Sequence, residues 1–167
     1  MSVAAGARQR DGARTLAAVV LIANSFVMLY PVFVMVLSGG LVAGIRAGFA
    51  YNTFPLMHGH VVPPEILMLA PWWKNFFWNM ATVQFDHRVL AWVLAFAVPL
   101  FAWRVLRAAL PGRARAAATA LVAMLAVQIA LGIATLVNVV PLPLAALHQA
   151  GAVVVFGLAL AAVHALR

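Results

Sequence analysis

Two histidines could do chemistry inside a membrane: His87 in VQFDHRVLAW and His148 in PLPLAALHQAGAVVVF. Each follows a loop-like stretch and lies a few residues into a long apolar segment. An ionisable side chain costs free energy inside a bilayer, so two of them at one depth indicate a ligand that uses both imidazoles. Because imidazole is an axial ligand of haem iron, a haem held by both histidines is the leading interpretation.

The composition is that of an integral membrane protein. Apolar residues make up 66% of the chain and charged residues 8%, where soluble domains have about 45–50% and about 25%. Four apolar runs are long enough to cross about 30 Å of hydrocarbon, and in lipid such runs form helices. We expect an all-α membrane protein, with one domain over residues 1–167 and four transmembrane helices in one bundle. The expected spans are Thr15–Gly48, Val83–Leu106, Arg115–Val137 and Leu144–Leu166.

The charges of the chain indicate an orientation in the membrane. The net charge is +8, but the arginines stand at the ends of apolar runs, which favours a topological role and no nucleic-acid partner. Three cations, Arg46, Lys74 and Arg88, lie near one side of the expected bundle. Eight lie on the other side: Arg8, Arg10, Arg14, Arg104, Arg107, Arg113, Arg115 and Arg167. The positive-inside rule then makes both termini and the Arg113 loop cytoplasmic, and both histidines lie near the outer face.

A weak internal repeat relates the two histidines. VMVLSGGLVAG ends the first span and AVQIALGIATL lies in the third, and each is followed by a proline-containing outer loop and a span with an early histidine. We therefore expect two tandem helical hairpins, each giving one ligand from its second helix. Small residues near the histidines, Ala91, Gly151 and Ala152, are expected to leave room for a macrocycle. The row Gly40, Gly44 and Gly48 is expected to serve ordinary helix packing.

The other polar residues of the outer half have less specific interpretations. Arg46 and Arg88 are candidate partners of haem propionates, with contacts to lipid headgroups as the alternative. His58 and His60 lack nearby acidic or Cys partners in sequence, which disfavours a metal site there. Asp86 precedes His87 in the expected first helical turn, where a carboxylate interacts well with the helix dipole. The chain has no Cys, which excludes disulfides and thiolate ligands.

Several motifs in this order resemble the carboxy-terminal half of the haem A synthase family. They are AGFAYNTFPLM, VQFDHR, QIALG and PLPLAALHQAG, and the similarity runs from about Val36 onward. The resemblance implies an enzyme of the bacterial plasma membrane with two similar four-helix halves, which oxidises the C8 methyl group of haem O to a formyl group. It also implies that His87 and His148 hold a haem b cofactor, with haem O as a possible substrate.

One residue departs from the pattern of that family. Where the family's amino-terminal half has a glutamate associated with catalysis, three residues before the first histidine, this chain has Gln84. A neutral amide cannot act as a carboxylate base, so no catalytic residue is assigned. The expected alternatives are a half that assembles with a separate amino-terminal half, a homo-oligomer of halves, and a fragment.

Two other functions remain open from the sequence. A non-catalytic b-type cytochrome would use the same two ligands for electron transfer alone. A transporter or structural bundle would use the histidines only for hydrogen bonds between helices, and it would bind no haem.

The orientation is testable because the chain contains no Cys. A cysteine introduced at Gly112 should be protected from an impermeant maleimide in intact cells, and one introduced at Trp73 should react. Reaction at Gly112 without cell lysis would contradict the expected topology.

Overall fold

The computed structural model describes residues 28–108 and 110–166. Their long helices are Met28–Gly44, called the first helix below, α3 (Met80–Arg107), α4 (Gly112–Val137) and α5 (Leu142–Ala165). Three short helices lie in the connection between the first helix and α3: η1 (Ala47–Phe49), η2 (Trp72–Lys74) and α2 (Asn75–Trp78). Within the described residues no β-strand occurs, so the all-helical expectation is confirmed there.

Three of these helices, α3, α4 and α5, are long and apolar enough to cross a membrane. Their bounds lie within three residues of those expected from the apolar runs. The first helix is shorter than a crossing, and the beginning of the expected Thr15–Gly48 span lies outside the described residues. The chain is therefore a multi-pass helical membrane protein, and the count of four spans stays a prediction.

The start of α3 differs from the expectation for a physical reason. Asn79 is its N-cap, and the side-chain oxygen of Asn79 accepts hydrogen bonds from the backbone N–H groups of Ala81 at 2.9 Å and Thr82 at 3.2 Å. Such a cap satisfies donors that the first helical turn leaves unpaired. The helix therefore begins before the apolar run does, and Asp86 lies beyond the first turn, so the expectation for Asp86 was wrong.

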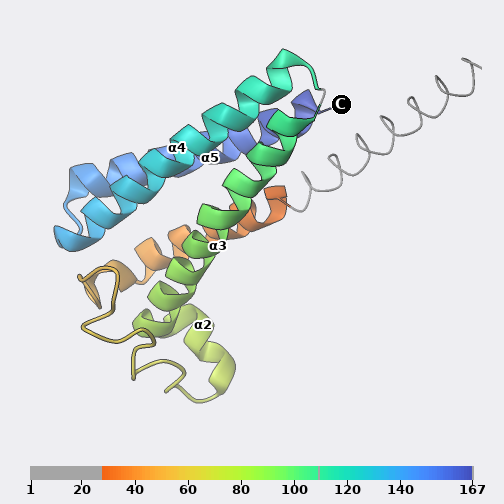
Figure 1. Cartoon of the computed structure of the whole chain (residues 1–167). Helices are drawn as coiled ribbons and strands as arrows, with labels where there is room; N and C mark the ends of the chain where they lie inside the picture. The colour runs from red at the N-terminus through yellow and green to blue at the C-terminus, as the bar shows by residue number, and fades with distance from the viewer. Residues whose placement is uncertain (1–27, 109, 167) are drawn as a thin grey trace, which may run out of the picture.

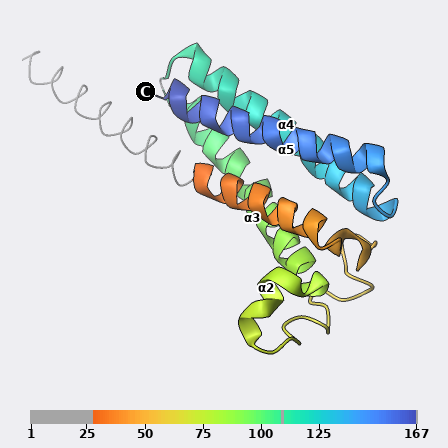
Figure 2. The ribbon, with the colours of Figure 1, turned by 180° about the vertical axis from the view of Figure 1, so that it is seen from behind.

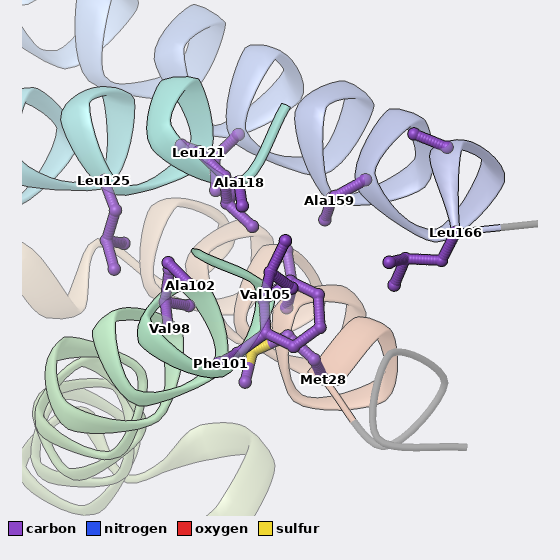
Figure 3. Close-up of a cluster of buried hydrophobic side chains, with 14 of the residues drawn as sticks. Met28, Val98, Phe101, Ala102, Val105, Ala118, Leu121, Leu125, Ala159 and Leu166 are labelled. Carbon is purple, nitrogen blue, oxygen red and sulfur yellow. The ribbon is translucent and has the colours of Figure 1, made fainter. Parts of the chain in front are cut away.

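The buried core lies in one half of the bundle. Side chains from α3, α4 and α5 interlock there with Met28 of the first helix (Figure 3). Alanines such as Ala118 and Ala159 are nearly fully buried, and small residues let membrane helices approach closely. In Figures 1 and 2 α3 converges with the α4–α5 pair near the C-terminus and diverges from it toward the opposite end. The bundle is thus closed at the end opposite the long connection.

Much of the remaining helix surface is exposed and apolar. Phe96 is 71% exposed and Val153 67% exposed, and both belong to helices long enough to span. Contiguous apolar surface of this kind is unfavourable in water and is the normal outer surface of a bundle in lipid.

The connection of residues 45–79 is folded over the diverging end. Asn75 is fully buried, and its side chain donates to the carbonyls of Leu69 at 2.9 Å and Trp72 at 2.8 Å while accepting from the backbone N–H of Leu69 at 2.9 Å. Asn52 donates to the carbonyls of Gly48 at 2.9 Å and Leu136 at 3.0 Å, which ties the connection to the end of α4. These amides replace the hydrogen bonds that a regular element would supply.

Aromatic side chains project from this connection. The exposed aromatic residues of η2 and α2 are Trp72, Trp73, Phe76, Phe77 and Trp78. Trp is enriched at the membrane–water interface, so the exposed rings are consistent with the expected position of this segment at the membrane surface.

Candidate functional site

His87 and His148 occupy matching depths in two different helices. His87 is the eighth residue of α3, and His148 is the seventh residue of α5. At about 1.5 Å of rise per residue, their distances from the helix starts differ by about 1.5 Å. His87 lies three residues and His148 two residues deeper than the expected span starts at Val83 and Leu144 imply, because each helix begins earlier than its apolar run. α3 and α5, which carry the two rings, both pack on α4.

The histidines lie just beyond the packed core. The outermost core residues of these helices are Leu94 on α3 and Val155 on α5, and each follows its histidine by seven positions. From there toward the long connection, the helices diverge (Figure 1). The imidazoles therefore lie where the core ends, and the core fixes the helices that carry them.

The His87 ring contacts the first helix. Its Nδ1 atom lies 3.2 Å from the Ser38 hydroxyl, at hydrogen-bond distance. Gly39 lies beside the ring, and a Cβ atom there would be 3.4 Å from Cε1 of His87. The bond at Nδ1 leaves Nε2 as the nitrogen available to a ligand.

The His148 ring contacts α4. A Cβ atom at Gly132 would be 2.8 Å from Cε1 of His148, closer than real Cβ contacts. The backbone carbonyl of His148 accepts a hydrogen bond of 2.7 Å from the Gln128 side chain. Nδ1 of His148 is buried with no hydrogen-bond partner among the described residues. Gly132 is thus required by the position of the ring, which is held by shape and not by a hydrogen bond.

The contact between a glycine and a histidine ring occurs twice, once with a glycine of the first helix and once with a glycine of α4. Gly39 lies five residues before the end of the first helix at Gly44, and Gly132 lies five residues before the end of α4 at Val137. Each glycine meets Cε1 of the histidine carried by the next long helix. We call this the glycine notch of each hairpin, Gly39 for His87 and Gly132 for His148.

Of the expected packing row, Gly48 alone lies in a close contact, where a Cβ atom would be 3.1 Å from Cγ2 of Val140, and the expectation for Gly151 was wrong. A Cβ atom at Gly40 or Gly44 would meet nothing within 4 Å, so neither glycine lies in a close contact with described residues. Gly151 was expected to leave room for a macrocycle, but the Gln128 amide of α4 fills the space beside it. The signal for the notches was the weak repeat itself, which contains Gly39 and Gly132.

The two candidate arginines differ in their surroundings. Arg88 donates from Nη1 to the carbonyl of Pro55 at 3.3 Å and from Nη2 to that of Tyr51 at 3.1 Å, while its Nε is buried without a partner among the described residues. Arg46 is exposed two residues beyond the end of the first helix, in a left-handed backbone conformation with φ of 58°. Arg88 is thus beside His87 but engaged with the long connection, and no contact places Arg46 near the histidines.

Gln84 has a structural partner that the sequence did not reveal. It is 3% exposed, and its Nε2 atom donates to the backbone carbonyl of Tyr51 at 3.0 Å. Gln84 and Arg88 lie one helical turn apart on α3 and bind the same carbonyl. A carboxylate at position 84 could not donate this bond.

Tyr51 is a fixed point of the connection on its side-chain end as well. Its hydroxyl donates to the carboxylate of Glu65. Burial, together with this bond, raises the pKa of Tyr51 to about 12, and the same bond lowers the pKa of Glu65. Tyr51 is therefore held at its backbone carbonyl by α3 and at its hydroxyl by Glu65.

The remaining histidines, His58, His60 and His164, are exposed. His58 and His60 are exposed on a turn in which Met57 and His60 exchange backbone hydrogen bonds of 2.8 and 3.1 Å. His164 is exposed near the end of α5. Among the described residues, no group of three or more His, Cys, Asp or Glu could hold a metal ion.

The His87 and His148 pair suits a haem better than a bare metal ion. A porphyrin supplies four nitrogens and needs only two axial ligands from the protein. The donors are two imidazoles at one depth, and the notches keep both rings against neighbouring helices. The unpartnered Nδ1 of His148 shows that nothing in the described protein specifies the tautomer of that ring.

The fold is that of a multi-pass helical membrane protein, and His87 and His148 are its candidate ligands. The model of a family described as cytochrome oxidase assembly protein matches residues 2–160. A protein named "Heme A synthase" from Nitrosospira multiformis is 66% identical over 81% of this chain and 38% of its own length. Proteins of the same name from Nitrosomonas eutropha and Rhodospirillum centenum are 55% and 47% identical over 77% and 80% of this chain, and 36% of each relative is covered.

The chain belongs to this family of cytochrome oxidase assembly proteins, the haem A synthase family. The expected resemblance is thereby confirmed. The chain spans less than two fifths of the length of these relatives. No solved structure matches it.

The notches can be tested with two matched substitutions. Gly132→Ala should displace the His148 ring and lower stability by about 1–3 kcal/mol, as overpacking does. Gly40→Ala meets no neighbour, so it should be neutral or stabilise its helix by up to about 1 kcal/mol. Thermal unfolding in detergent measures both. Equal stability of the two variants would contradict the notch at Gly132.

Proposed function

We propose that this chain holds one haem b between His87 and His148 and forms the cofactor half of a haem A synthase. The observation that carries the proposal is that α3 and α5 each have a histidine seven or eight residues into the helix, with its ring against a glycine of a neighbouring helix. Membership of the family, whose named relatives are haem A synthases, supports haem A as the product and haem O as the substrate.

Residues of this chain would divide the work at the haem. Nε2 of His87 and of His148 would bind the iron, and the notches would keep the rings from turning away. Gln84, three positions before His87, and Arg88, the residue after it, hold the connection at the Tyr51 carbonyl and would so keep water from this end of α3. The bound haem would supply one-electron redox chemistry.

Gln84 argues against methyl oxidation by this chain alone. Positive charge that develops beside a reacting haem is best stabilised by a fixed carboxylate. The Gln84 amide is neutral, and its nitrogen is already bonded to the Tyr51 carbonyl. We propose that the oxidation of the C8 methyl takes place in a partner polypeptide like the missing amino-terminal half, or in a second copy of the chain.

A second candidate is a b-type cytochrome that only transfers electrons. An electron-transfer cytochrome requires the same two ligands and no carboxylate. The neutral Gln84 is therefore as compatible with this function as with a cofactor half. Formation of haem A distinguishes the two functions.

We propose that the protein lies in the bacterial plasma membrane with both termini in the cytoplasm. The α3–α4 turn, near Arg107 and Arg113, lies at the same end as the C-terminus, and the aromatic connection lies at the opposite end (Figure 1). This separation of charge and aromatic residues is what the positive-inside rule and an outer interfacial segment require.

The ligand assignment predicts a six-coordinate, low-spin haem in the purified protein. His87→Ala and His148→Ala should each give a high-spin spectrum or lose the haem, because one axial ligand is removed. His164→Ala should change neither, since His164 is exposed near the end of α5. Extraction of the pigment should identify haem B. An unchanged low-spin spectrum in both alanine variants would show that other ligands bind the iron.

The division of labour predicts no haem A from this chain alone. Cells that accumulate haem O and lack their own haem A synthase should make none when they express only this chain. Co-expression of an amino-terminal half from a relative should restore it, and Gln84→Glu should not. Pigment analysis measures the products. Haem A made by the single chain would place the catalytic step within these helices.

A further inference from the structure

The two candidate ligands differ in one contact. Nδ1 of His87 lies 3.2 Å from the Ser38 hydroxyl, which is half-buried on the first helix. Nδ1 of His148 is buried and has no hydrogen-bond partner among the described residues. The difference matters because a ligand histidine normally donates its second N–H to an acceptor, which fixes the ring and raises its basicity.

The register of the two hairpins explains the difference. The notches align Gly39 with Gly132, since each glycine meets Cε1 of its histidine. The residue before the notch is Ser38 in the first hairpin and Leu131 in the second. A hydroxyl therefore stands at the position where the equivalent residue of the second hairpin offers only an apolar side chain.

We propose that Ser38 is a positioning residue that makes the two axial histidines electronically unequal. With Nε2 on iron, the proton of the His87 ring must lie on Nδ1, and the Ser38 hydroxyl accepts it. His87 is then the more basic and more firmly oriented ligand. His148 is the weaker ligand, because its Nδ1–H has no acceptor from Leu131. This inference rests on the proposed haem site, and it goes beyond it by assigning a role to Ser38.

The electronic consequence has a definite sign. A hydrogen bond from Nδ1–H increases electron donation from the imidazole, which stabilises ferric iron more than ferrous iron and lowers the reduction potential. Removal of the Ser38 hydroxyl should raise the midpoint potential. Addition of a hydroxyl at position 131 should lower it, provided that the two notches are equivalent.

The test compares four forms of the haem-loaded protein in detergent by spectroelectrochemistry. Ser38→Ala should raise the midpoint potential by up to the equivalent of a tenfold change in relative ferric affinity, which for one electron is about 59 mV. Ser38→Thr keeps a hydroxyl and should stay near the wild-type value. Leu131→Ser should shift the potential in the opposite direction. Optical spectra confirm that all forms remain low-spin.

The outcomes separate this inference from the proposed function. A potential unchanged in both Ser38→Ala and Leu131→Ser would overturn the role of the hydroxyl. Equal shifts in Ser38→Ala and Ser38→Thr would also overturn it, because the effect would then come from packing. If Leu131→Ser alone has no effect, the equivalence of the notches is wrong. Wild-type protein that binds no haem would instead overturn the proposed function.

Discussion

An imidazole within a lipid bilayer must have its polar atoms satisfied by protein or by a ligand, and this constraint shapes the half of the molecule that carries both histidines. The packed core fixes α3 and α5 at the opposite end of the bundle, and its last residues, Leu94 and Val155, lie seven positions from the histidines. Beyond the core, each ring lies against a glycine of the neighbouring helix. Only one of the two Nδ1 atoms has a described partner, so the arrangement is complete on the side of His87 and incomplete on the side of His148.

The long connection depends on the same part of α3. Its anchor at Tyr51 is the carbonyl that Gln84 and Arg88 bind, and these residues lie three positions before and one position after His87. A second anchor, Asn52, bonds to the end of α4 beyond the Gly132 notch. The cover over the diverging helices is thus fixed to both hairpins. Displacement of the connection would therefore disturb α3 at the depth of its histidine.

The parts of this structure that depend on residue type and apolar length could be predicted from the sequence. The histidines were found because ionisable residues are rare in apolar runs, and α3, α4 and α5 followed from the runs themselves. The beginning of α3 was missed because Asn79 caps it within an aromatic stretch. Ser38 and Gly39 were missed because small residues in a membrane helix normally indicate packing, and only the contact with His87 gives them a further meaning. The bond from Gln84 to Tyr51 joins residues far apart in the chain, which no local pattern reveals.

If the two histidines of one chain share one haem, the ratio of haem to protein is one haem per chain. Native mass spectrometry of the detergent-purified protein should show one haem per chain, in the monomer or in any higher assembly. A haem present only in dimers, at one per two chains, would mean that the ligands come from different copies. Protein that stays free of haem after reconstitution with haem B would contradict the account altogether.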